Sequence, residues 1–104
     1  MTRHLVRYTL KPGRAAENEE LASAVYAALR RSRPQGLRYA TFRLEDGLTY
    51  LHLVAHDEAD DSNALTALPE FQAFVAGIRE RCAELPVTTA LTEVGSYGFF
   101  DNHT

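Results

Sequence analysis

The stretch that decides the fold is "GLRYATFRLEDGLTYLHLVAH", residues 36–56. On both sides of Asp46-Gly47 the side chains alternate with a period of two and are rich in β-forming residues, which is typical of strands. Asp-Gly is a favoured two-residue turn because both of its central positions require a positive φ. The sequence therefore predicts a hairpin with four facing pairs: Glu45 with Leu48, Arg43 with Tyr50, Thr41 with His52, and Tyr39 with Val54.

The two faces of this hairpin differ in composition. The first face is apolar and is expected to pack under helices; it carries Ala40, Phe42, Leu44, Leu51, Leu53 and Ala55. The second is too aromatic for water yet too polar for a dry core; it carries Tyr39, Thr41, Arg43, Tyr50, His52 and His56. We expect the helices to leave this second face open, so that another surface must cover it.

His52 and His56 are four residues apart, a spacing that presents two zinc ligands when it occurs on a helix. On a strand the two side chains stand roughly 13 Å apart, whereas two ligands of one zinc lie at most ~4 Å apart. They are therefore not expected to share a metal. The acids that follow are interpreted as a solvated loop with a possible helix cap, because the oxygen spacing and glycine of a calcium loop are missing; they are Asp57, Glu58, Asp60 and Asp61, with Asp61 or Ser62 as the cap.

Two more strands and two helices surround the hairpin. Residues 3–10 alternate like a strand that Pro12-Gly13 ends, and residues 86–97 form a β-branched, alternating strand that ends near Gly95. Residues 14–33 carry apolar side chains at helical spacing, with glutamates in the first turns and arginines in the last, which suits the helix dipole. A second helix begins near Pro69, and its apolar stripe holds Phe71, Phe74, Val75, Ile78 and Cys82.

The order β-α-β-β-α-β predicts an α+β, ferredoxin-like sandwich, with an antiparallel sheet and two helices on one face. Right-handed crossovers place the first and third strands in the middle of the sheet. A chain of 104 residues has the size of one domain that buries an adequate core, so we expect a single domain over residues 1–104.

Composition argues against several classes of partner. The net charge is −3 and no basic patch is interleaved with aromatic residues, so a nucleic-acid partner is not expected. No apolar run reaches the ~20 residues of a membrane span, and "MTRHLVRY" lacks the apolar region of a signal peptide. We therefore expect no membrane partner and a cytoplasmic location. The single cysteine, Cys82, is interpreted as a small core residue near a helix end.

Three stretches carry a resemblance to a known family. They are the first strand with "KPG" and an acidic helix after it, "PQGLRYATFRL" entering the hairpin, and "ALPEFQAFVAGI" on the second helix. Together they resemble the antibiotic-biosynthesis-monooxygenase-like proteins of the dimeric α/β-barrel superfamily. The resemblance implies a homodimer in which two protomers pack their open sheet faces into a barrel. Characterised members include cofactor-independent oxygenases of polyketide quinols and haem-degrading enzymes.

The resemblance also suggests site residues. The quinol oxygenases are thought to use a tryptophan with an asparagine and a tyrosine, and this chain has no tryptophan. It does have Tyr8 on the first strand and Asn18 on the first helix, which could hold a phenolic or enolic substrate by hydrogen bonds. Members often carry a histidine shortly before the equivalent of "PEF", where this chain has Leu65. Neither haem nor another cofactor or metal is therefore expected.

His52 is a third catalytic candidate, because a histidine with a pKa of about 6.5 can act as a general base. Two pockets are considered for the ligand. A helix-side pocket would combine Tyr8 and Asn18 with walls of Phe42, Leu51, Phe74 and Ile78, whereas a pocket at the dimer interface would use His52, Arg43 and Tyr50. We favour the helix side. Purely structural roles stay open for all three candidates: Tyr8 in the core, Asn18 at a solvated edge, and His52 in a polar interface.

The expected function is the binding of a small aromatic or polyketide-like molecule, with cofactor-independent oxidation as the activity that the resemblance implies. The alternative is a non-catalytic homodimeric barrel that binds a metabolite or another protein. Fold alone does not decide between an enzyme and a binding protein.

Overall fold

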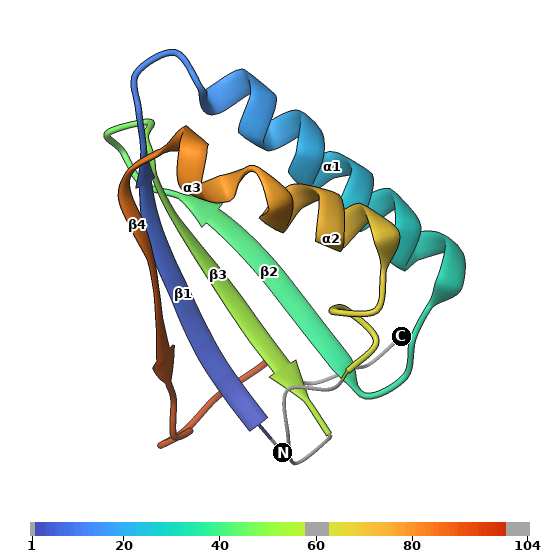
Figure 1. Ribbon diagram of the computed structural model, residues 1–104. Helices are drawn as coiled ribbons and strands as arrows, with labels where there is room; N and C mark the ends of the chain where they lie inside the picture. The colour runs from blue at the N-terminus through green and yellow to red at the C-terminus, as the bar shows by residue number, and fades with distance from the viewer. Residues whose placement is uncertain (1, 58–62, 100–104) are drawn as a thin grey trace.

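The computed structural model describes residues 2–57 and 63–99 (Figure 1). The interpretation of Glu58, Asp60, Asp61 and Ser62 as loop and cap lies outside these residues. The elements in chain order are β1 (Thr2–Leu10), α1 (Ala15–Ser32), β2 (Leu37–Arg43), β3 (Thr49–His56), α2 (Pro69–Ala76), α3 (Ile78–Arg81) and β4 (Cys82–Ala90).

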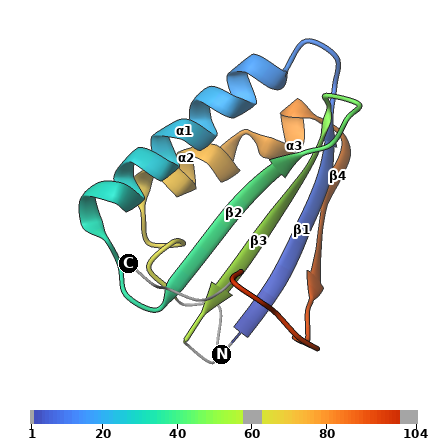
Figure 2. The same cartoon turned by 180° about the vertical axis from the view of Figure 1, so that it is seen from behind.

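The four strands form one antiparallel sheet in the order β2-β3-β1-β4. Helices α1, α2 and α3 all lie on one side of it, and the other side of the sheet is not covered by a helix (Figures 1 and 2). The α+β, ferredoxin-like prediction is confirmed, and so is the central position of the first and third strands. Within the described residues, no helix has the length and apolar character needed to cross a membrane.

The hairpin register is confirmed. Three predicted pairs face one another across β2 and β3: Tyr39 with Val54, Thr41 with His52, and Arg43 with Tyr50. The turn itself differs from the prediction, because Gly47 has a positive φ of 74° and Asp46 does not. Instead, the Asp46 carboxylate accepts hydrogen bonds from the backbone N–H groups of Leu48 and Thr49, at 2.9 and 2.8 Å, and so stabilises a longer loop.

The assignment of the two sheet faces was wrong. The helices cover the aromatic-polar face, where Tyr50 is 2% exposed and His52 is 4% exposed. The face predicted to be the core is the uncovered one, and Phe42 on it is 45% exposed. The physical reason is that the polar atoms of the aromatic face find partners in the core. The ring of Tyr8 stacks on that of Tyr50, with centroids 5.6 Å apart, while its hydroxyl bonds to His52.

The predicted helices are observed, except that the second one ends earlier than expected. Helix α1 matches the predicted range, and α2 begins at Pro69 as expected. The second helix breaks at Gly77 and ends at Arg81, so Cys82 opens β4 instead of closing the helical stripe. The reason is that Cys82 pairs with Leu10 of β1 and has extended dihedrals. The last strand therefore begins four residues earlier than predicted and ends at Ala90, although Cys82 is buried as expected.

Candidate functional site

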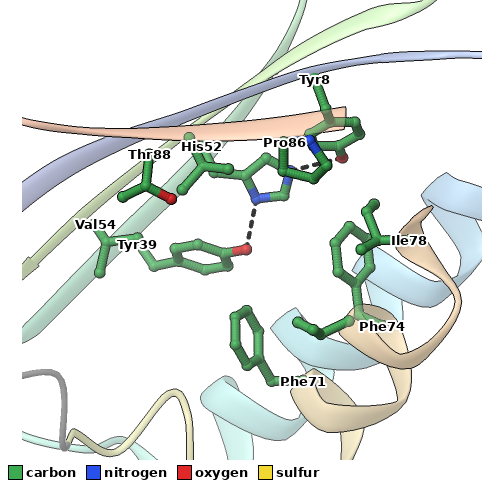
Figure 3. Close-up of a pocket in the computed structure, with 11 residues that line it drawn as sticks. Tyr8, Tyr39, His52, Val54, Phe71, Phe74, Ile78, Pro86 and Thr88 are labelled. Atoms are coloured by element: carbon green, nitrogen blue, oxygen red, sulfur yellow. Dashed lines mark hydrogen bonds between the residues drawn. The ribbon is translucent and has the colours of Figure 1, made fainter. Parts of the chain in front are cut away.

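A cavity of about 220 Å³ lies between the covered face of the sheet and the second helical segment. Its wall includes Tyr8 of β1, Tyr39 of β2, His52 of β3, Phe71 and Phe74 of α2, and Ile78 of α3 (Figure 3). The phenyl rings and the aliphatic side chain lie on the helical side. The hydroxyls and the imidazole lie on the sheet side together with Val6, Val54 and Pro86, so the cavity is mostly apolar and carries a few polar groups on one side.

Four side chains form a continuous series of hydrogen bonds beside this cavity. The amide nitrogen of Asn18 donates to the Tyr8 hydroxyl at 2.9 Å, and that hydroxyl lies 2.8 Å from Nε2 of His52. The other ring nitrogen, Nδ1, lies 2.6 Å from the Tyr39 hydroxyl (Figure 3). The series joins α1 to three strands, and its members reach each other only in the folded chain.

Arg81 holds the far end of the series. Its Nε donates to the Asn18 side-chain oxygen at 3.1 Å, and its Nη2 donates to the backbone oxygen of Phe74 at 2.9 Å. The guanidinium carbon lies 5.0 Å from the centroid of the Phe74 ring, within the range of a cation–π contact. These contacts fix the orientation of the Asn18 amide, because an arginine can only donate.

A side branch leaves the series at His52. Thr41 places its hydroxyl 3.3 Å from Nδ1, and the same hydroxyl lies 2.7 Å from that of Tyr26 on α1. Tyr26 and Tyr39 stack with ring centroids 5.3 Å apart. The position of Tyr39 is therefore set both by ring packing and by its bond to His52.

Burial controls the protonation states. It lowers the pKa of His52 from 6.5 to about 4, so the imidazole is neutral at pH 7. It raises the pKa of Tyr8 and that of Tyr39, so both phenols keep their protons. A neutral imidazole between two phenols carries one hydrogen and one lone pair. His52 is thus suited to orient hydroxyls and is a weaker base than the sequence analysis assumed.

The structure brings together part of the predicted site. Tyr8, His52, Phe74 and Ile78 line one cavity, and Asn18 lies directly behind Tyr8. The prediction that Phe42 and Leu51 form walls was wrong, because the register places both on the opposite face of the sheet from His52.

The second pocket considered, built on Arg43, Tyr50 and His52, is divided. Arg43 and the Tyr50 hydroxyl both bond to Glu19 of α1, at 2.7 and 2.6 Å, whereas His52 faces the cavity. The polar atoms of Arg43 and Tyr50 therefore face Glu19 and not the cavity, although the Tyr50 ring stacks on that of Tyr8.

Sequence reasoning missed Tyr39, Phe71 and Arg81. Tyr39 shares its side of β2 with Thr41, so correct assignment of the buried face would have found it. Phe71 belongs to the predicted helical stripe and gave the same kind of signal as Phe74. Arg81 gave none, because a charged residue near a helix end normally reaches solvent.

The position compared with the histidine of other family members is part of the hydrophobic core. Leu65, at the position where family members often have a histidine, is 2% exposed and belongs to the hydrophobic core. Among residues 2–57 and 63–99, no group of three or more His, Cys, Asp or Glu side chains is placed to hold a metal ion.

Solved structures with the same fold include several of similar size. Rv0793 from Mycobacterium tuberculosis superposes with a TM-score of 0.73 at 17% identity, covering 91% of this chain and 96% of that one. A mutant of SnoaB, a cofactor-independent oxygenase from Streptomyces nogalater, superposes with a TM-score of 0.68 at 19% identity, covering 93% of this chain and 96% of that one. PA3566 from Pseudomonas aeruginosa superposes with a TM-score of 0.70 at 17% identity, covering 90% of this chain and 94% of that one. At such identities the likeness shows the fold.

Sequence comparison identifies the family directly. No curated protein matches the chain. The model of the antibiotic biosynthesis monooxygenase family matches residues 1–77, which include β1, both strands of the hairpin and all of α2. The match covers well over half of the 104 residues and contains most of the cavity wall. The chain therefore belongs to the antibiotic biosynthesis monooxygenase family.

Proposed function

We propose that this protein binds a small aromatic or polyketide-like molecule in the cavity between the sheet and α2, and oxidises it with O₂ without a cofactor. The observation that carries the proposal is the position of the Tyr8–His52–Tyr39 series at one side of an otherwise apolar cavity. A small number of fixed polar groups facing aromatic walls is the usual composition of a small-molecule site.

The two walls define how such a ligand would lie. Its ring would pack against Phe71 and Phe74, and its oxygen would point toward Tyr39 and His52. The ring plane of Phe71 is nearly perpendicular to that of Tyr39, with centroids 6.3 Å apart, so the two rings form an edge-to-face pair at the cavity wall.

The chemistry would rest on the substrate. A deprotonated phenol or enol is electron-rich and can add O₂ at a ring carbon, giving a hydroperoxide once a proton is taken up. Loss of water from that carbon then leaves a carbonyl, so one oxygen atom enters the product and the other leaves as water. The protein would hold the anion in one orientation and exclude water from the reacting carbon.

The comparison with SnoaB supports this proposal at the level of the fold. That protein is described as a cofactor-independent oxygenase, and its chain superposes on nearly all of this one. The candidates suggested by the family resemblance, Tyr8 and Asn18, are hydrogen-bonded to each other and to the rest of the series.

The second candidate function is ligand binding without catalysis, and the lowered pKa of His52 favours it. Because burial lowers the pKa of His52 to about 4, the imidazole takes a proton from a phenol poorly at pH 7. A protein of this kind would retain its ligand unchanged in the presence of O₂.

We also propose that the protein is a homodimer joined through the uncovered face of the sheet. Large apolar side chains remain exposed there in the single chain, including Phe42 at 45% and Val87 at 63%. Leu51 and Leu53 of β3 alternate with the buried residues and so lie on the same uncovered face. Packing two such faces would remove this apolar area from water, as the family's barrel architecture implies.

An oxygen electrode tests the enzymatic proposal. Purified protein would be mixed with a panel of one-ring to four-ring hydroquinones, and O₂ uptake would be compared with that of buffer. We expect uptake with at least one of them, reduced at least tenfold in Tyr8→Phe and unchanged in Tyr97→Phe, which alters a 99% exposed tyrosine. Ligand retention without uptake would support the binding protein instead.

A further inference from the structure

Arg81 is a buried cation next to the cavity. It is 1% exposed, and among the described residues no carboxylate lies within ion-pair distance of it. Its contacts are the Asn18 oxygen, the Phe74 carbonyl oxygen and the Phe74 ring. A buried charge is normally paired; here the Glu17 carboxylate interacts with Arg81 electrostatically without a direct ion pair, and the direct polar contacts of the guanidinium are with Asn18 and Phe74, which support the cavity wall.

The guanidinium also fixes the direction of the hydrogen bonds. Arg81 can only donate, so the Asn18 oxygen accepts and the Asn18 nitrogen donates to Tyr8. The Tyr8 oxygen is then an acceptor, and its own hydrogen goes to Nε2 of His52. A neutral imidazole that accepts at Nε2 carries its hydrogen on Nδ1, which donates to the Tyr39 oxygen.

The opposite direction is unfavourable. If His52 carried its hydrogen on Nε2, the Tyr8 oxygen would accept from both His52 and Asn18. The hydroxyl hydrogen of Tyr8 would then have no acceptor among the described residues, and Tyr8 is only 2% exposed. A buried donor left unsatisfied is costly, so the arrangement selects the Nδ1–H form of His52.

The last hydrogen in this direction belongs to Tyr39. Its oxygen accepts from His52, and its own hydrogen can turn either to Thr41 or to a ligand oxygen in the cavity. Figure 3 shows the Tyr39 hydroxyl pointing toward the space between His52 and the two phenylalanines. A hydrogen bond to a charged oxygen is roughly twice as strong as one between neutral groups, so an anionic ligand would compete well with Thr41.

We propose that Arg81 fixes the direction of this series so that the Tyr39 hydroxyl donates a hydrogen bond to the anionic oxygen of a bound phenolate or enolate. The inference rests on the proposed function, because it assumes that the cavity binds an aromatic ligand. It adds Tyr39 as a residue that touches the ligand and Arg81 as a positioning residue. The cavity would accordingly prefer the ionised form of a phenol to its neutral form.

The first test needs no ligand. Nuclear magnetic resonance of isotope-labelled imidazole nitrogens reports which nitrogen of His52 carries the hydrogen. We expect Nδ1–H in the wild type. In Asn18→Asp the carboxylate would accept from both Arg81 and Tyr8, so His52 would donate from Nε2 to the Tyr8 oxygen and the tautomer would reverse. A wild-type Nε2–H form, or an unchanged tautomer in a folded Asn18→Asp, would overturn the assigned direction.

The second test uses para-nitrophenol, whose absorbance distinguishes anion from neutral phenol, and para-nitroanisole, which cannot ionise. We expect the wild type to lower the apparent pKa of bound para-nitrophenol below its value in water. Tyr39→Phe should weaken binding of the anion at least tenfold and leave para-nitroanisole unchanged, while Tyr97→Phe should change neither.

The outcomes separate the two proposals. Equal binding of anion and neutral probe, or equal loss of both in Tyr39→Phe, would overturn the role of Tyr39 while leaving the cavity as an aromatic site. Binding of neither probe would contradict the proposed function and the ligand contact together. In that case the tautomer of His52 would still decide whether Arg81 sets the direction of the series.

Discussion

The Tyr8 hydroxyl lies 2.8 Å from Nε2 of His52, although 44 residues separate the two in the chain. The pair joins the two central strands within the layer that the helices cover. Tyr8→Phe would leave the imidazole nitrogen and the Asn18 amide nitrogen without this partner. We expect the free energy of unfolding to fall by about 1–3 kcal/mol, measured by urea denaturation.

Tyr97→Phe is the matched control for this change, because Tyr97 is 99% exposed. It should alter the free energy of unfolding by less than about 0.5 kcal/mol. Equal stability of the wild type and Tyr8→Phe would mean that the buried hydroxyl contributes nothing to the fold.

Stability should depend on pH through His52. Burial lowers its pKa in the folded state from 6.5 to about 4, so between these values the unfolded chain binds a proton that the folded chain does not. Stability therefore falls as the pH decreases from about 6.5 to about 4, and the loss attributable to His52 is complete below that. The pKa difference corresponds to about 3 kcal/mol.

A comparison with His52→Gln isolates this effect, since glutamine can still donate and accept but does not titrate. Hydrogen bonds also lower the pKa values of Glu17, Glu19 and Asp46. Their protonation in acid reduces the free energy of unfolding of both proteins alike. Urea denaturation at pH 7 and pH 4 should show the larger acid loss in the wild type. Parallel losses would contradict the assignment.

The proposed dimer should depend on the uncovered sheet face. Phe42→Glu places a charge on that face, and because Phe42 is already 45% exposed the single chain should fold normally. We expect light scattering at micromolar concentration to give a dimer mass for the wild type and a shift toward monomer for the variant. Tyr50→Glu is unsuitable for this purpose, because Tyr50 is buried under the helices.

Ala27→Glu supplies the control for the dimer experiment, because it adds the same charge at an exposed position of α1. Its mass should match that of the wild type. A wild-type monomer, or a Phe42→Glu variant that stays fully dimeric, would rule out an interface at this face.

Gly36 should be sensitive to substitution for two reasons. Its φ is +74°, and a Cβ atom there would clash with the Asp57 carboxylate. Gly47 has the same φ but nothing within 4 Å of its Cβ position. Gly47→Ala should therefore cost the roughly 1–2 kcal/mol of a left-handed alanine, and Gly36→Ala should cost more. Thermal unfolding of the two variants measures the difference, and an equal Tm would show that Asp57 moves aside freely.

The order of elements and of strands could be predicted because the signals for them are local. Alternation over two residues marked the strands, and Gly47 marked the turn between β2 and β3. One general rule, the right-handed crossover, then placed β1 beside β3. None of these steps required knowing which distant side chains meet.

The covered face could not be predicted in the same way. Alternation divides a strand into two faces without saying which one the helices cover, and the apolar face containing Phe42 and Leu51 was the natural choice. What decided the outcome was the satisfaction of Tyr8, His52 and Tyr39 by one another. Those bonds depend on the pairing of separate strands, so composition alone does not reveal them.

Some residues of the candidate site could be found from the sequence and others could not. Tyr8 and Asn18 came from the family resemblance and are indeed hydrogen-bonded to each other, whereas Arg81 gave no signal. It lies 63 residues from Asn18 in the chain, and only the tertiary fold brings the two side chains together. A buried arginine at a helix end is a product of tertiary structure.

The strand order β2-β3-β1-β4 also constrains the sequence of events during folding. β2 and β3 are joined by a short loop and can pair early, whereas β1 is made first and must wait for both of its neighbours. Its Leu10 meets Cys82 and its His4 meets Ala90, contacts that close long loops and slow the search. On the ribosome, β1 therefore has an unpaired edge until β4 emerges, and the cavity cannot hold a ligand before then, because Pro86 and Thr88 of β4 belong to its wall.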